Sequence, residues 1–289
     1  MRVHVTGAGG FVGGHLVSTL VEEGHDVVAS AQSRRRVPTG DGITPLELDL
    51  RGPVDVDVPA LGAIVHLAQA NMPFPDDARG LLAVNAVATH ELLELARRSG
   101  ATRFVYASSG SVYEPSTERL DESAPLRADD FYSVTKRTGE LVLESYASYL
   151  TSAVALRLFT PYGPRQANRL VPALVQRIRS GEPITLNDGG RPRLTPVFVG
   201  DLVRSVSAAL RVDGHHVANV AGDEVVGILE LAEKIGAVVG REPLFEQGTQ
   251  PVAGDLLGSN ERMKALLGVD APVSLDDGLR ATVGAETLA

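Results

Sequence analysis

Three side chains of this 289-residue chain have the types and order that proton and hydride transfer need: Ser109, Tyr132 and Lys136. Tyr132 and Lys136 are four residues apart in a predicted helix over 130–149, so both project from one face. A free phenol has a pKa of about 10, and a neighbouring ammonium lowers that pKa toward the range of a general base. The Ser109 hydroxyl would donate to a substrate oxygen on which negative charge grows. A surface Tyr/Lys pair can have the same spacing, so the surrounding sequence decides between the two interpretations.

The N-terminal segment predicts a binding site for a phosphate-bearing cofactor. Residues 2–6 form an apolar run that predicts a strand, and a helical pattern starts near Phe11. Between them, Gly7, Gly10 and Gly13 recur at three-residue spacing. Such a turn leaves free backbone N–H groups at the positive end of the helix, where a dinucleotide pyrophosphate binds. A plain Gly-rich turn is the alternative interpretation.

Strand and helix patterns alternate along the first half of the chain. The predicted strands cover residues 2–6, 26–30, 44–48, 62–67, 103–107 and 153–158. Helical spacing over 76–99 and 130–149 separates the later strands. This alternation predicts a doubly wound α/β fold of the Rossmann type, in which helices cover both faces of a parallel sheet. Ligands of such sheets bind beyond the carboxyl ends of the strands.

The chain changes character after Thr160, where Pro and Gly become denser and the predicted elements shorten. We predict a dinucleotide-binding domain over residues 1–160, to which residues 196–221 return. Residues 161–195 and 222–289 are predicted to form a smaller C-terminal substrate lobe. A substrate cleft is expected between the domain and the lobe.

Composition restricts the partners that the chain can bind. The net charge of −9 and the isoelectric point near 5.3 argue against nucleic acid and anionic membranes, because both need a basic face. The absence of cysteine excludes disulfides, thiolate catalysis and cysteine-ligated zinc, and no metal site is expected. We expect a cytoplasmic protein, because the sequence shows neither a basic leader nor an apolar run long enough to span a bilayer.

Further motifs follow in order along nearly the whole chain. They are Thr6-Gly7-x-x-Gly10-x-x-Gly13, Asp49-Leu50, His66-Leu67-Ala68, Asn85, Ala107-Ser108-Ser109-x-Ser111-Val112-Tyr113, Tyr132-x-x-x-Lys136, Arg157-Leu158-Phe159, Tyr162-Gly163-Pro164 and Val199-Gly200-Asp201-Leu202. In these motifs the chain resembles the extended short-chain dehydrogenase/reductase family, within its NAD-dependent epimerase/dehydratase group. The segment 260–268 is similar to the last helix of that family.

The resemblance implies a role for each matching position. Tyr132 would be the general acid/base, Ser109 would orient the substrate oxygen, and Lys136 would also hold the nicotinamide ribose. Asp49 and Leu50 would contact the adenine. The remaining expected cofactor contacts are Gly7, Gly10, Phe11, Val12, Gly13, Leu67, Ala68, Gln69, Asn85 and Phe159. His66 ends a buried strand and is interpreted as a core histidine.

The end of the second strand bears on the choice of cofactor. Members of the family that prefer NAD place an acidic residue there to bind the ribose 2′-hydroxyl. This chain has Ala31 at that position, followed by Arg34, Arg35 and Arg36. An apolar residue at this position, with arginines shortly after it, suits a cofactor that carries a 2′-phosphate. NADP is therefore the expected cofactor and NAD the alternative. A solvated basic loop would also explain the arginines.

Two departures from the family pattern bear on the substrate. Dehydratases and decarboxylases of the family carry carboxylates after the catalytic hydroxyl, where this chain has Gly110 and Ser111, so reduction or epimerisation remains. Relatives that bind sugar nucleotides clamp the diphosphate with one asparagine and two arginines, whereas the matching positions here hold Thr160, Leu194 and Val252. Either the phosphates are held differently or the substrate lacks them. The predicted substrate-binding residues are Ser111, Thr160, Arg165, Arg169 and Arg193.

The expected function is NADPH-dependent reduction of a ketone, on a keto-sugar nucleotide. The alternative is an NAD-dependent nucleotide-sugar epimerase, which oxidises and re-reduces one carbon. A reductase of a non-nucleotide ketone and a non-catalytic dinucleotide sensor also remain open, although sensors of this family usually lose the Tyr or Lys that this chain keeps. A homodimer is expected.

Overall fold

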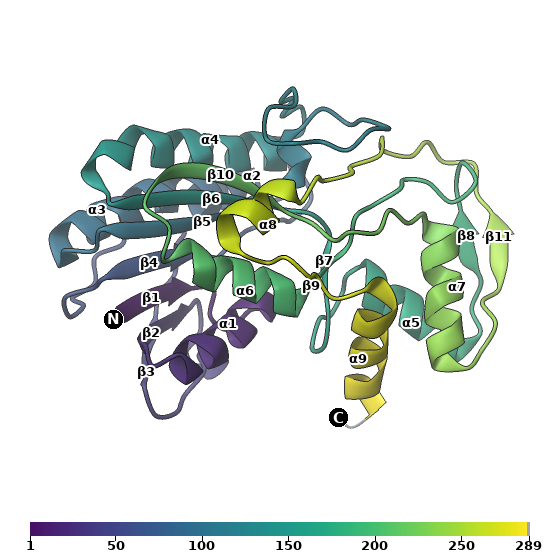
Figure 1. The fold of residues 1–289 in the computed structure, drawn as a ribbon, viewed down its shortest axis with the longest axis horizontal. Helices are drawn as coiled ribbons and strands as arrows, with labels where there is room; N and C mark the ends of the chain where they lie inside the picture. The colour runs from purple at the N-terminus through teal and green to yellow at the C-terminus, as the bar shows by residue number, and fades with distance from the viewer. Residues whose placement is uncertain (288–289) are drawn as a thin grey trace.

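The computed structural model describes residues 1–287. Its centre is a seven-stranded parallel sheet with strand order β10-β6-β5-β4-β1-β2-β3 (Figure 1). The strands are β1 (Arg2–Thr6), β2 (Asp26–Ala31), β3 (Ile43–Glu47), β4 (Ala63–His66), β5 (Arg103–Ser109), β6 (Ser152–Leu158) and β10 (Gly214–Val220). The predicted doubly wound α/β fold is confirmed.

Helices cover both faces of the sheet, because its central strands are apolar on both sides. Along β4, Ala63 and Val65 point into one hydrophobic core, and Ile64 between them points into the other. Figure 1 shows the helices that lie against each face. They are α1 (Phe11–Glu22) and α6 (Val199–Ala209) on one face, and α3 (Ala88–Ser99) and α4 (Phe131–Tyr146) on the other.

The strand order reverses between β1 and β4, which are neighbours in the sheet. From β1 the chain proceeds to β2 and β3 on one side, and from β4 to β5, β6 and β10 on the other. The connections that leave these two strands therefore part at their carboxyl ends and open a crevice there. This crevice is the place where such folds bind ligands.

The predicted helix over 76–99 is interrupted. It consists of α2 (Ala78–Leu82), a π-helical segment over Ala83–Val87, and α3. Within the π segment, the carbonyl oxygen of Asn85 accepts a hydrogen bond from the Tyr106 hydroxyl at 2.8 Å. This hydrogen-bond partner lies on β5, so the wider π-helical turn depends on a contact between two elements. The periodicity of apolar residues within one helix does not reveal such a contact.

A smaller lobe has its own hydrophobic core and lies at one end of the sheet (Figure 1). Its elements are α5 (Leu170–Ser180), α7 (Ile228–Val239), α9 (Leu275–Thr287), and the paired strands β8 (Ile184–Leu186) and β11 (Phe245–Gln247). A short pair, β7 (Pro161–Tyr162) with β9 (Val197–Phe198), lies between the lobe and the main sheet. No helix within residues 1–287 combines the length and the apolar character that crossing a membrane requires.

Helix α8 (Glu261–Leu267) departs from the predicted lobe over 222–289. It packs against α6 and β10 of the main sheet. Met263 and Leu267, one turn apart on the same helix face, are buried in the core that α1 and α6 share. The apolar face of α8 is thus buried on the domain, and the lobe comprises the segments on either side of it.

Candidate active site

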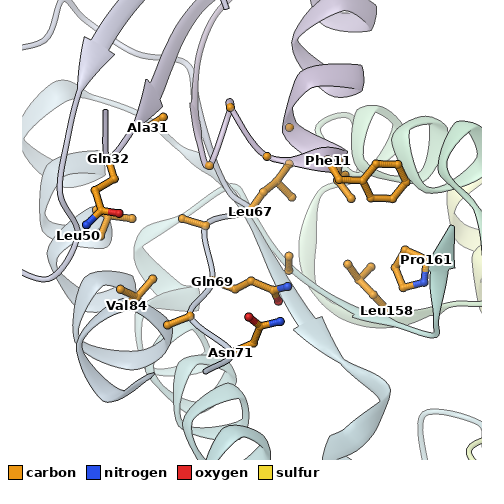
Figure 2. Close-up of a pocket in the computed structure, with 18 of the residues that line it drawn as sticks. Phe11, Ala31, Gln32, Leu50, Leu67, Gln69, Asn71, Val84, Leu158 and Pro161 are labelled. Carbon is orange, nitrogen blue, oxygen red and sulfur yellow. The ribbon is translucent and has the colours of Figure 1, made fainter. Parts of the chain in front are cut away.

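A cavity of about 860 Å³ opens at the crevice between β1 and β4 (Figure 2). It is bounded by the Gly-rich loop, by the carboxyl ends of the neighbouring strands and by the segment 158–171. Most of the predicted cofactor residues line it. These are Gly7, Gly10, Phe11, Val12, Gly13, Ala31, Asp49, Leu50, Leu67, Ala68 and Gln69.

The Gly-rich loop has the geometry of a pyrophosphate cradle. Gly7 has a φ of +68°, and a side-chain carbon there would lie 2.8 Å from the backbone nitrogen of Ala68. At Gly13 such a carbon would overlap the carbonyl oxygen of Gly7. Gly10 precedes α1 without a side chain to cap it, so the first N–H groups of the helix face the cavity. These residues fit the phosphates of a dinucleotide.

Tyr132 and Ser109 both line the cavity, and Lys136 lies buried beneath them. The Tyr132 hydroxyl donates to Oε1 of Gln69 at 3.1 Å. The Lys136 ammonium donates to the carbonyl oxygen of Ala107 at 2.8 Å and lies 5.9 Å from the centre of the Tyr132 ring. Contact between Lys136 and the nicotinamide ribose stays a prediction, because its side chain is not part of the cavity wall.

Burial dominates the protonation of the two groups. It raises the pKa of Tyr132 to about 12, against the opposing effects of a hydrogen bond from Ser109 and the charge of Arg169. Burial also lowers the pKa of Lys136 to about 7, partly offset by the charge of Glu140. Burial therefore outweighs the lowering of the phenol pKa that was expected from the ammonium. Tyr132 is a neutral phenol at neutral pH, poised to donate a proton.

A buried carboxylate that the sequence reasoning missed fixes α4 against β5. Oε1 of Glu140 accepts from the Ser108 hydroxyl at 2.5 Å, and Arg157 binds both carboxylate oxygens at 2.8–2.9 Å. Lys136 and Glu140, four residues apart, thereby contact the consecutive residues Ala107 and Ser108, directly before Ser109. The continuation of the four-residue spacing from Tyr132 through Lys136 to Glu140 is a signal that could have found it.

Asn85 and Phe159, which were also predicted to contact the cofactor, lie outside the cavity wall as Lys136 does. Asn85 is buried and holds both backbone groups of Ala70 at 2.9 Å and the Thr135 hydroxyl at 3.1 Å. It ties the loop after β4 to α4, which is a positioning contact. Phe159 is buried against Gly110 and Tyr113. Its neighbour Leu158 lines the cavity, and successive residues of an extended segment point to opposite sides, so Phe159 points away from the cavity.

The arginines after β2 are arranged differently from the prediction. Arg34 and Arg35 lie in an exposed 3₁₀ turn, Arg34–Arg36, and do not line the cavity, whereas Arg36 does. The backbone of Arg34 is held by Glu47, whose Oε2 accepts from its N–H at 3.3 Å. That turn carries Arg36 over Gly9 of the Gly-rich loop.

The predicted substrate residues divide into two groups. Thr160, Arg165 and Arg169 line the cavity. Ser111 instead donates to the Ser109 hydroxyl at 2.9 Å, and Arg193 binds the carboxylate of Asp255 at 2.8 Å on another part of the cleft. Neither of these two residues forms part of the cavity wall.

Sequence reasoning also missed Asn71, which lines the cavity. In the amide orientation that matches donors with acceptors, its side-chain oxygen accepts from Nη1 of Arg169 at 3.2 Å and also from Nη2. The polar residues Gln69 and Asn71 alternate after β4, which is the signal that could have found it.

A family model described as the NAD dependent epimerase/dehydratase family matches residues 3–221. The chain belongs to this family. The enzyme is therefore of the short-chain dehydrogenase/reductase type, as its Tyr132, Lys136 and Gly-rich loop predicted.

Similar proteins cover almost the same length. The chain is 31% identical to a UDP-glucose 4-epimerase of Mycolicibacterium smegmatis, over 98% of this chain and 97% of that protein. It is 30% identical to a dTDP-4-dehydro-6-deoxy-D-allose reductase of a Streptomyces species, over 97% and 94%. The solved structure of MoeE5 in complex with UDP-glucuronic acid and NAD superposes with a TM-score of 0.89 at 27% identity, covering 100% of this chain and 99% of that one.

Proposed function

We propose that this enzyme reduces the keto group of a sugar nucleotide with NADPH. The observation that carries the proposal is the placement of the Tyr132 and Ser109 hydroxyls, which both line the cavity that the Gly-rich loop bounds. Gly110 and Ser111 follow the Ser109 hydroxyl, so no carboxylate stands directly after it to eliminate water. A relative named as a keto-sugar reductase supports this reading.

A bound nicotinamide dinucleotide would supply the hydride for the carbonyl carbon. The Tyr132 hydroxyl gives its proton to the carbonyl oxygen, so that the ketone becomes an alcohol and the phenol a phenolate. The Ser109 hydroxyl donates to the same oxygen while its negative charge grows. Lys136, held by Ala107, stabilises the phenolate until a proton from solvent restores the phenol.

The cofactor preference is proposed from Ala31 and Arg36, which both line the cavity. A carboxylate at Ala31 would repel a 2′-phosphate, whereas a guanidinium binds one through charge-assisted hydrogen bonds of about 1.5–3 kcal/mol. We expect NADPH to bind at least about tenfold tighter than NADH at one fixed salt concentration. Arg36→Ala should remove most of this ratio, and the control Arg34→Ala should keep it, because Arg34 lies outside the cavity wall. Equal dissociation constants in the wild type would contradict the assignment of NADP.

A second candidate is an NAD-dependent nucleotide-sugar epimerase. The solved relative that binds NAD with UDP-glucuronic acid, and the relative named as an epimerase, favour it. An epimerase returns its hydride, so it converts UDP-glucose or UDP-glucuronic acid to an epimer without net change of the cofactor. A reductase oxidises one NADPH for each keto sugar consumed. Product analysis together with NADPH absorbance distinguishes them, with Tyr132→Phe as the inactive control.

We also propose that two copies of the chain associate through α4 and the α2–α3 segment. Val134 and Leu141, seven residues apart on α4, are 41% and 49% exposed. Leu82 and Val87 on the neighbouring segment are 45% and 50% exposed. A second copy would bury both pairs in a self-complementary interface. Light scattering should give a dimer, and Leu141→Glu should give a monomer; a monomeric wild type would contradict the proposal.

A further inference from the structure

Two groups of arginines differ in whether their N–H donors are already bound by carboxylates of the protein. On the side of the small lobe, Arg191 and Arg193 share the buried carboxylate of Asp255 at 3.1 and 2.8 Å. Arg193 also donates to the Thr117 carbonyl oxygen at 3.2 Å. These donors are directed at the protein itself. This part of the small lobe, which has Leu194 next to Arg193, therefore offers a phosphate few free hydrogen-bond donors.

Arg165 and Arg169, in the loop that leads into α5, have a different environment. Both line the cavity, and within residues 1–287 neither forms an ion pair with a carboxylate. Each is held instead by a neutral partner. The Asn71 amide oxygen accepts from Arg169, and Nδ1 of His15 lies 3.0 Å from Nη2 of Arg165. The other ring nitrogen of His15 lies 3.0 Å from the Pro164 carbonyl oxygen and donates to it, so Nδ1 accepts from Arg165.

Arg169 belongs to the reacting end of the cavity. Its partner Asn71 is two residues from Gln69, which accepts from the Tyr132 hydroxyl at 3.1 Å. Figure 2 shows the Gln69 and Asn71 side chains next to each other in the cavity. The positive charge of Arg169 also favours the phenolate of Tyr132. A ligand group bound by Arg169 would therefore lie close to the catalytic hydroxyl.

The loop that carries both arginines has a strained backbone. Thr160 and Arg165 have φ values of +41° and +67°, in the left-handed region that these residue types rarely occupy, and Asn168, of a type that adopts this region more readily, has a φ of +55°. Such strain persists where the surrounding structure over-determines it, which is common at binding sites. Arg165 and Arg169 of this loop both line the cavity.

We propose that Arg169, supported by Arg165, binds an anionic group of the substrate in the cavity beside Tyr132. This inference rests on the proposed function. The group is an oxygen anion that accepts two parallel N–H bonds, either a carboxylate on the sugar or the diphosphate of the nucleotide. In both cases the charge lies near the carbon that reacts.

Calorimetric titration with UDP-glucose and UDP-glucuronic acid tests the proposal, because the two probes share the diphosphate and differ by one carboxylate. The protein is saturated with oxidised cofactor, and every variant carries Tyr132→Phe so that no probe is turned over. Arg169→Gln is compared with Arg177→Gln, a control on the surface of α5 whose side chain lies outside the cavity wall. Thermal unfolding and cofactor affinity, unchanged in both, verify that the variants fold.

Two results support the proposal and identify the anion. If the anion is the carboxylate, UDP-glucuronic acid binds about tenfold tighter than UDP-glucose, and Arg169→Gln abolishes that difference alone. If it is the diphosphate, Arg169→Gln weakens both probes by about the same tenfold factor. Probes that bind the wild type and are unaffected by Arg169→Gln overturn the proposal while the proposed function stands. Failure of both probes to bind the wild type overturns the proposed substrate class, and this inference with it.

Discussion

At the scale of single residues, burial rather than charge sets the state of the catalytic phenol. Burial raises the pKa of Tyr132 to about 12 and lowers that of Lys136 to about 7. A neutral phenol can donate a proton at once, as ketone reduction requires. Oxidation of an alcohol first requires the phenolate, which additional positive charge in the cavity must stabilise.

Tyr132→Phe tests this role directly. The substitution keeps the ring and removes only the hydroxyl, so we expect turnover to fall by about 10²–10⁴-fold. Dinucleotide affinity should remain within about twofold, because the lost atom hydrogen-bonds Gln69 and not the Gly-rich loop. Steady-state kinetics and a binding titration measure the two quantities. A variant that keeps more than about a third of the wild-type rate would refute the assignment.

Thr160 provides a second prediction at this scale. Its φ of +41° is unfavourable for a β-branched residue, whereas asparagine adopts this region more readily. We expect Thr160→Asn to raise the free energy of unfolding by about 1 kcal/mol, measured by urea denaturation. Thr117→Asn, at an exposed position without a positive φ, is the matched control. A loss of stability in Thr160→Asn would mean that the threonine side chain makes compensating contacts.

At the scale of elements, α4 is fixed to the end of β5 through Lys136 and Glu140. Glu140→Gln would leave the Arg157 guanidinium, which is 3% exposed, without its carboxylate partner. Breaking a buried ion pair costs about 3–5 kcal/mol, so we expect the free energy of unfolding to fall by that amount. Ser108→Ala removes one neutral partner of the same carboxylate and should cost about 1 kcal/mol.

The two variants also separate stability from catalysis. Glu140 raises the pKa of Lys136, so Glu140→Gln should shift the Lys136 step of the pH–rate profile to lower pH. Ser108→Ala keeps the charge and should leave that step unchanged. Denaturant titrations and rates across pH give both readouts. Equal stability losses in the two variants would contradict the role of the ion pair.

The sequence predicted those elements whose determinants are local. The Gly-rich turn, the start of α1 at Phe11 and the strands from β1 to β6 were predicted because spacing and apolar runs register them directly, whereas β10 was not predicted as a strand. The orientation of Arg36 was not predicted, because residues one apart in a 3₁₀ turn differ by about 120° in direction. Asn85 and Glu140 were missed as positioning residues because their partners, Ala70, Ser108 and Arg157, are distant in sequence.

At the scale of the whole molecule, two histidines lie in the centre of the sheet. His4 on β1 and His66 on β4 are fully buried, and each has one ring nitrogen without a hydrogen-bond partner. The other nitrogens pair with Ser30 at 2.9 Å and Thr6 at 2.8 Å. His66 is thus the core histidine that the sequence predicted. Protonating either ring would place an uncompensated charge in the core of the domain.

Their pKa values make stability depend on pH. Burial lowers the pKa of His4 to about 4, and burial together with the charge of Lys136 lowers that of His66 to about 3. Both rings take up protons near pH 6.5 in the unfolded chain but not in the folded one. Stability is therefore fully present above about pH 6.5 and is lost as the pH falls toward 4 and 3.

We expect the free energy of unfolding to fall by about 2–3 kcal/mol per pH unit between about pH 6 and pH 4.5, since each ring contributes about 1.4. Urea denaturation at several pH values measures this slope. His4→Gln removes one titrating ring and should reduce the slope by about half. His90→Gln, at a side chain that is 50% exposed, should leave it unchanged. Equal slopes for His4→Gln and the wild type would show that other groups control acid unfolding, because a ring that is absent takes up no proton.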